Sequence, residues 1–125
     1  MKLRTKTFAL RVLRLAASLP RTIEAVVIKR QVVRSGTSVA SGYRAACRAK
    51  SGADFTYKLS VIEEEADETA LWLELIADDG MLPAEKVAPL LKEADEITAM
   101  MVSAQKTARG LRIAVNPKSK IQTPK

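Results

Sequence analysis

A row of arginines between residues 30 and 48 is the feature of this sequence best suited to chemistry. If the segment is helical, with about 100° per residue, six polar side chains share an arc of roughly 80°. They are Arg30, Arg34, Thr37, Ser41, Arg44 and Arg48. The aliphatic residues around Val39 fall on the opposite side, so the row does not fill the protomer's own core. Guanidinium groups bind phosphates through paired hydrogen bonds, which suits a nucleic-acid backbone. A solvated face, or pairing with acidic side chains of another helix or subunit, stays open.

Charge is segregated along the chain, which has 125 residues and a net charge of +7. Residues 1–58 hold 13 basic and 2 acidic side chains, residues 59–98 hold 2 and 12, and residues 99–125 hold 6 and none. Such blocks indicate either a polyanionic partner or pairing between segments or subunits.

Basic residues near the end of the chain add candidates for nucleic-acid binding: Lys106, Arg109 and Arg112. With only 4% aromatic residues to stack on bases, we expect contact with the RNA or DNA backbone and little base-specific recognition.

The residue inventory excludes most familiar catalytic and metal chemistry. Histidine is absent and Cys47 is the only cysteine, which excludes a disulfide framework, a Cys/His zinc site and a Ser-His-Asp triad. The acidic run Glu63–Glu65 raises the question of a metal or acid–base site. Carboxylate di-metal bundles, however, normally take a Glu-x-x-His motif from each of two helices. We therefore expect no enzyme activity, no bound metal and no cofactor.

A second candidate surface lies in the acidic block. Leu71 and Leu75 fall on the acidic side of their predicted helix, away from its apolar row, and Trp72 lies between them in sequence. Exposed apolar residues beside charges are typical of subunit contacts, in which tryptophan is a favoured anchor. We expect these three residues to form an oligomer interface; the alternative is that a wide core simply covers them.

Apolar residues at steps of four and three predict helices nearly throughout the chain. The rows begin at Phe8, at Ile28, at Phe55 and at Val87. A short helix should end at Pro20, a second should run from Thr22 (the N-cap) to Arg48, a third from Ala53 to Ala77, and a fourth after Pro83. Gly36 and Gly42 inside the second helix indicate close approach of a neighbour. Three long helices with short connections predict an all-α, antiparallel up-and-down four-helix bundle.

The expected organisation has three parts: a basic N-terminal arm (residues 1–7), the bundle (residues 8–112) and a basic, disordered tail (residues 113–125). Arg11 and Arg14 interrupt the apolar run near the start, so it does not fit a signal sequence. No run approaches the length of a membrane span. We expect a cytoplasmic protein with no membrane partner.

Several fragments, in order, resemble the family of small four helix bundle proteins, which includes open reading frames in intervening sequences of bacterial 23S ribosomal RNA genes. These fragments are Arg30–Ser38, Ala53–Phe55 with Lys58 and Leu59, Glu64 with Glu65, Glu68 with Thr69, and Trp72 with Leu73. The similarity runs from about Phe8 to about Arg109. It implies a ring-like homopentamer and no established enzyme activity. A related protein is the accessory variability protein of diversity-generating retroelements, which binds a reverse transcriptase and its RNA; here the likeness is in fold and charge, not in a shared motif.

Two hypotheses follow. In the first, the chain is a non-catalytic nucleic-acid-binding accessory protein, with RNA as the expected nucleic acid and a retroelement reverse transcriptase as a possible partner. In the second, it is an oligomeric scaffold that ignores nucleic acid, and its positive second helix pairs with the acidic third helix of a neighbour. The two can coexist if a ring uses one face for assembly and another for RNA.

Overall fold

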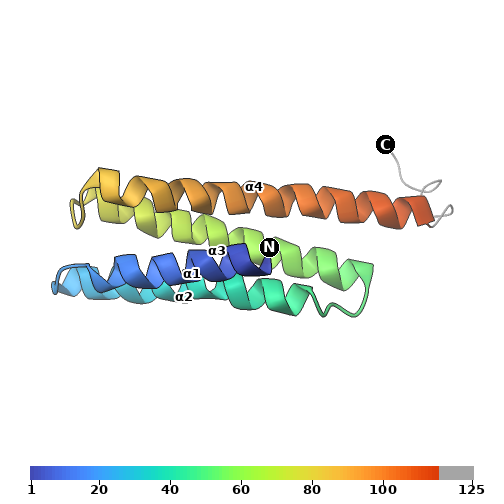
Figure 1. Cartoon of the computed structure of the whole chain (residues 1–125), viewed down its shortest axis with the longest axis horizontal. Coiled ribbons are helices and arrows are strands. Elements are labelled where there is room, and N and C mark those ends of the chain that lie inside the picture. The colour runs from blue at the N-terminus through green and yellow to red at the C-terminus, as the bar shows by residue number, and fades with distance from the viewer. Residues whose placement is uncertain (116–125) are drawn as a thin grey trace.

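The computed structural model describes the backbone of residues 1–115 and the side chains of residues 1–110, and it shows four helices joined by short connections (Figure 1). The helices are α1 (Lys2–Ala17), α2 (Ile23–Ala46), α3 (Gly52–Asp78) and α4 (Ala84–Val115). Successive helices run in opposite directions, and the residues described contain no strand. The predicted all-α, up-and-down four-helix bundle is therefore confirmed.

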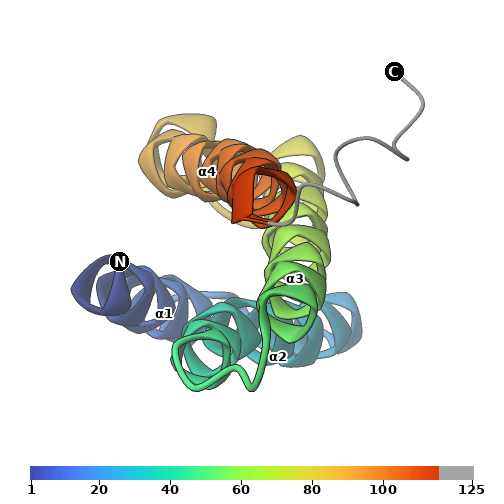
Figure 2. The ribbon, with the colours of Figure 1, turned by 90° about the vertical axis from the view of Figure 1, so that its right-hand side faces the viewer.

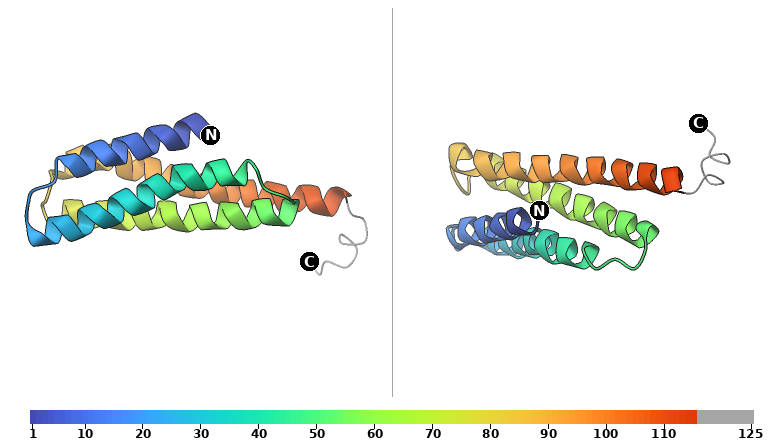
Figure 3. Two further views of the ribbon diagram at one scale, coloured as in Figure 1. Left: turned by 90° about the horizontal axis from the view of Figure 1, so that it is seen from below. Right: turned by 45° about the vertical axis from the view of Figure 1, so that its right-hand side comes forward.

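The helices follow one another around the bundle in chain order (Figure 2). α3 packs extensively against both α2 and α4, and α1 packs against α2. The contact between α1 and α4 is the smallest of the four contacts between helices. With 16 residues against 32 in α4, α1 is about 24 Å long where α4 is about 48 Å. α1 therefore covers only part of the length of α4, and α4 also extends beyond the ends of α2 and α3 (Figure 3).

Short polar residues and a glycine define the helix ends. The Thr22 hydroxyl accepts a hydrogen bond from the Ala25 N–H at 3.1 Å, which confirms the predicted N-cap. Ser51 does the same for the N–H of Asp54 at 3.0 Å at the start of α3. Gly80 has φ of +77° just after α3, a backbone conformation that glycine adopts without strain.

The expected basic arm is wrong, because residues 2–7 form the first turns of α1. Thr5 is buried, and its hydroxyl lies within hydrogen-bond distance of the carbonyl oxygens of Met1 (3.0 Å) and Lys2 (3.2 Å). Arg4 bonds to α4. These contacts hold the segment in helical form although it lacks an apolar row. The expected disordered tail (residues 113–125) is wrong at residues 113–115, which continue α4, and residues 116–125 lie outside the residues described.

The predicted apolar rows all face one core. Eighteen of their members are buried: Phe8, Val12, Leu19, Val32, Ser35, Val39, Ala46, Leu59, Ile62, Ala66, Thr69, Leu73, Ile76, Val87, Leu90, Ala94, Ile97 and Met101. Others, such as Leu15 and Phe55, are partly buried and pack against the cluster. The core is aliphatic apart from Phe8. No helix among the residues described is long and apolar enough to cross a membrane.

Two glycines in α2 mark the closest approaches between helices. A Cβ at Gly36 would lie 2.8 Å from both γ-carbons of Val12 on α1, and a Cβ at Gly42 would lie 3.0 Å from Cγ1 of Ile62 on α3. α2 nevertheless remains one continuous helix through both positions. Both glycines therefore serve the close approach of a neighbour, as the sequence predicts.

Candidate nucleic-acid interface and assembly surface

α2 positions the arginine row as predicted over most of its length. The helix is unbroken from Ile23 to Ala46, and both Arg30 and Arg44 are exposed and make no ion pair among the described residues. Their separation of 14 residues corresponds to about 21 Å along the helix axis. Arg48 is exposed but lies beyond the C-cap residue Cys47, so the prediction that it continues the helical row is wrong.

Arg34 has a different role from its two neighbours in the row. One of its terminal nitrogens lies 3.2 Å from the Glu65 carboxylate, the other pairs with the Glu68 carboxylate, and its Nε donates to Gln31 Oε1 at 3.2 Å. Both glutamates belong to α3 of the same protomer. The expectation that the whole row is free for a partner is therefore wrong at Arg34, and the alternative of pairing with another helix is confirmed there.

The hydroxyl groups of the predicted row are bonded within α2. Thr37 Oγ1 donates to the carbonyl oxygen of Val33 at 2.7 Å, and Ser41 Oγ donates to that of Ser38 at 3.3 Å. The guanidinium groups of Arg30 and Arg44 are thus the donors on this face of α2 that have no bond within the described residues.

Positive charge is concentrated on the α1–α2 layer. Residues 1–50 hold twelve basic side chains and one acidic side chain, Glu24. Among the described residues, Arg4 and Arg34 are the members of this set that form ion pairs. The exposed cations without an ion pair in the same part of the chain are Lys2, Lys6, Arg14, Arg21, Lys29, Arg30, Arg44, Arg48 and Lys50.

The predicted basic residues near the end of the chain belong to another surface. Lys106 and Arg109 are exposed on α4. Within the described residues α2 and α4 do not contact each other, so these two residues do not extend the α2 row. The side chain of Arg112 lies outside the described residues. The structure therefore divides the predicted nucleic-acid site into two separate groups.

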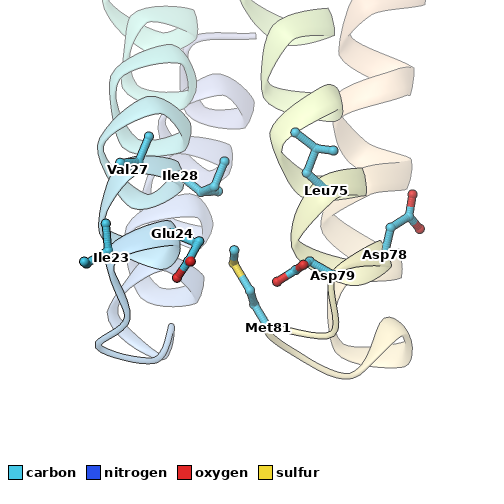
Figure 4. A pocket seen from close by; sticks show the side chains of 8 residues that line it. All are labelled: Ile23, Glu24, Val27, Ile28, Leu75, Asp78, Asp79 and Met81. Carbon is cyan, nitrogen blue, oxygen red and sulfur yellow. The ribbon is translucent and has the colours of Figure 1, made fainter.

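An apolar groove with an acidic rim lies between the start of α2 and the end of α3 (Figure 4). Its volume is about 610 Å³, and its lining residues are Ile23, Glu24, Val27, Ile28, Leu75, Asp78, Asp79 and Met81. Ile23 and Val27 are 82% and 55% exposed, which is unusual for large aliphatic residues in the folded chain. Sequence analysis missed this groove because the two walls come from segments about 50 residues apart.

The structure separates the three predicted interface residues. Leu71 and Leu75 are 47% and 39% exposed on the outward face of α3, as expected. Trp72 is half-buried, packs against the core, and donates from Nε1 to the Glu68 carboxylate at 3.1 Å. The prediction of an exposed tryptophan anchor is wrong, because Trp72 turns toward the contact between α2 and α3.

Beneath the Arg34 ion pairs, a buried polar contact joins α2 to α3. Thr69 Oγ1 lies 2.8 Å from Ser35 Oγ and 2.8 Å from the carbonyl oxygen of Glu65. Arg34, Ser35, Glu65, Glu68, Thr69 and Trp72 all belong to fragments that carry the family resemblance. In this chain these six residues form one interhelical network, which fixes the packing of α2 on α3.

A second ion-pair cluster links α1 to α4. Arg4 bonds the Glu93 carboxylate through two nitrogens, at 2.7 and 2.9 Å, and reaches Glu96 at 2.8 Å. The hydrogen bonds from Arg4 hold the pKa of Glu93 below its usual value, although partial burial opposes the shift. At the start of α3, a hydrogen bond from Lys58 and another from the Lys50 backbone N–H lower the pKa of Asp54.

Comparison with known proteins agrees with the fold. A sequence model for the 23S rRNA-intervening sequence protein family matches residues 2–103. A search of curated proteins found no match. A solved structure from Bacteroides thetaiotaomicron, described as a protein of unknown function from the S23 ribosomal protein family, is 33% identical and has a TM-score of 0.79; the match covers 84% of this chain and 97% of that one. The chain belongs to the 23S rRNA-intervening sequence protein family.

Proposed function

We propose that this protein is a non-catalytic, nucleic-acid-binding accessory protein that grips the phosphate backbone with its α1–α2 layer. The observation that carries the proposal is the concentration of exposed, unpaired cations on that layer, described above. The name of the family refers to ribosomal RNA, so RNA is the nucleic acid we expect. A reverse-transcriptase partner, which the sequence resemblance implies, is part of the same proposal.

Contact with phosphates explains the arrangement better than base recognition does. Arg30 and Arg44 are about 21 Å apart on a rigid helix, a spacing that lets them reach separate phosphates. Arg21 and Arg30 also line one shallow hollow with Thr22, Ile23 and Val26. Single-strand-binding proteins commonly stack bases on aromatic residues. Here Tyr43 is half-buried and Tyr57 is on the acidic helix α3, so neither accompanies the arginines as a stacking platform.

The test is a filter-binding titration of RNA and of duplex DNA with a double charge reversal on α2. We expect R30E/R44E to weaken nucleic-acid binding on the order of tenfold or more. The magnitude of the slope of log K against log salt concentration should fall by about 2, because each phosphate contact contributes roughly 0.9 to that slope. The matched control is K86E/K92E, which changes the net charge equally at two exposed lysines of α4 that belong to neither group of the predicted site. The proposal is contradicted if both variants lose the same amount of affinity for nucleic acid, or if the unmodified protein does not bind nucleic acid at low salt.

A second candidate is a self-assembling scaffold, favoured by the exposed aliphatic residues on α2 and α3. Ile23, Val27 and Leu75 line the groove of Figure 4, Leu71 lies one helical turn before Leu75 on α3, and all four are exposed in the protomer. Burying such residues between copies is worth about 25 cal/mol per Å² of apolar surface. Assembly as a ring-like homopentamer, which the resemblance implies, belongs to this candidate and is tested by mass in solution.

A further inference from the structure

The outward face of α1 is apolar and basic. Leu3, Leu10 and Leu13 are 76%, 41% and 42% exposed, and Lys6 and Arg14 are exposed beside them. The five side chains fall within an arc of roughly 100° on the side of α1 opposite Phe8 and Val12. Neither cation has an ion-pair partner among the described residues. This face is therefore apolar surface flanked by unpaired positive charge.

The outward face of α3 has the opposite charge and the same apolar character. Leu71 and Leu75 are exposed beside four exposed carboxylates: Glu64, Asp67, Glu74 and Asp78. None of these carboxylates forms an ion pair within the described residues. The groove beside Leu75 extends the apolar surface to Ile23 and Val27 of α2.

We propose that the outward face of α1 in one copy docks on the outward face of α3 in a second copy. The proposal rests on the second candidate function, assembly, and names the surfaces that meet. The segment from Leu3 to Arg14 and the segment from Asp67 to Asp78 each span 11 residue steps, or about 16 Å. Leucines can then pack against leucines while lysine and arginine face aspartate and glutamate. Opposite potentials of this kind select the partner surface and the orientation.

The structure favours α1 over α2 as the partner of a neighbour's α3. The sequence alone left open a pairing of the positive second helix with another subunit's acidic helix. In the structure, Arg34 already bonds to Glu65 and Glu68 of its own protomer. The outward face of α1 has exposed leucines beside both of its cations. On α2, exposed aliphatic residues flank Arg30 alone and adjoin the groove on the α3 side, whereas Arg44 is flanked by Ala40 and Ser41. Because the two docking faces are different surfaces of the protomer, the contact is head-to-tail and repeats from copy to copy.

The test reverses the charge on each face separately and then on both faces together, which restores opposite charges across the contact. Sedimentation velocity measures the mass of the assembly in each case. We expect K6E/R14E and D67K/E74K each to weaken assembly on the order of 100-fold, because like charges then face each other. The four-residue variant K6E/R14E/D67K/E74K should return to within about tenfold of the unmodified protein. In an equimolar mixture of the two double variants, unlike copies should associate, since the contact between them is again complementary. A five-membered ring cannot alternate the two variants throughout, so the mixture should form open or even-numbered assemblies. Circular dichroism and urea unfolding establish that each variant is folded.

The control is R30E/R44E, which carries the same change in charge on α2 and should assemble normally. If the unmodified protein is monomeric, both assembly and the pairing are wrong. If it assembles but neither K6E/R14E nor D67K/E74K changes its mass, the pairing is wrong and assembly stands. If R30E/R44E dissociates the protein while K6E/R14E does not, α2 is the partner of α3 and the proposal is overturned.

Discussion

The two sides of α2 are held by different kinds of contact. Toward α3, a buried hydroxyl pair, Ser35 with Thr69, lies beneath the Arg34 ion pairs. Toward α1, the main feature is the steric fit of Val12 against Gly36; on its other side, α1 is joined to α4 by the Arg4 ion pairs. Hydrogen bonds have directional geometry, so the α2–α3 contact specifies the axial position of one helix on the other. The α1 contact specifies mainly how closely the helices approach.

This difference identifies α1 as the edge of the bundle. It is the shortest helix, its contact with α4 is small, and its outward leucines are uncovered. α3, by contrast, packs extensively against both α2 and α4. An edge helix with an uncovered apolar face is the element most suited to contact with another copy, whereas α2 and α3 provide the rigid frame.

Adding a methyl group at Gly36 is the largest expected disturbance of the α1 side. In Gly36→Ala the new Cβ meets Val12 at 2.8 Å, and a β-branched side chain in a helix has almost no other rotamer. We expect a loss of about 2 kcal/mol in the free energy of unfolding, after allowing for the better helix propensity of alanine. Urea denaturation followed by circular dichroism measures it.

Two other glycine substitutions serve as controls for the stability loss in Gly36→Ala. In Gly42→Ala the contact is with a single carbon of Ile62 at 3.0 Å, so the loss should be smaller; in Gly110→Ala nothing lies within 4 Å, and no loss is expected. Val12→Ala should be less damaging in the Gly36→Ala background than alone, because it relieves the clash. Equal losses at the three glycines would show that backbone effects, not the fit to α1, decide the stability.

Removing the buried hydroxyl of Thr69 tests the α2–α3 side. Valine has nearly the same shape, but Thr69→Val leaves Ser35 Oγ with only a 3.4 Å contact to the carbonyl oxygen of Val32. We expect a loss of about 1 kcal/mol in the free energy of unfolding, since a buried polar atom loses its partner. The double variant S35A/T69V should recover most of it, because both polar groups are then gone. If the double variant is no more stable than T69V, the hydroxyl pair does not contribute as argued.

Most of the fold was predictable because helix periodicity is a local property of the sequence. The rows through Val39, Leu59 and Ile97 have the 4-3 spacing that a buried helix face needs, and all three residues are buried. The start of α1 was not predictable in the same way. Residues 2–7 have no apolar row, and they are held in the bundle by Thr5 and by the contact of Arg4 with Glu93, which depends on a helix almost 90 residues away.

The candidate site was predicted only as far as single-helix geometry determines it. The outward direction of Arg30 and Arg44 follows from 3.6 residues per turn. The pairing of Arg34 depends on the axial position of α3, which periodicity does not contain. The sequence did contain an indication of this pairing. Glu65 and Glu68 are three residues apart, so they lie on one side of a helix that must adjoin α2. The groove between Ile23 and Leu75 had no such signal.

The Arg4 ion pairs predict a small dependence of the α1 side on pH. The pKa of Glu93 is lowered in the folded state, so the contribution of the pair is fully present above the unfolded-state pKa and is lost as pH falls through the lowered value. Because Arg4 is partly exposed, we expect the ion pair to contribute less than about 1 kcal/mol to the free energy of unfolding.

The measurement is urea unfolding at neutral pH and in the acid range below the ordinary carboxyl pKa. The free energy of unfolding should depend less on pH in Glu93→Gln than in the unmodified protein. Glu85→Gln is the matched control, since Glu85 is on α4 and, in the part of the chain whose side chains are described, forms no ion pair. If Glu93→Gln and Glu85→Gln retain the same pH dependence as the unmodified protein, the Arg4 contact does not hold α1 to α4, and the fit of Val12 against Gly36 is then the principal attachment of α1.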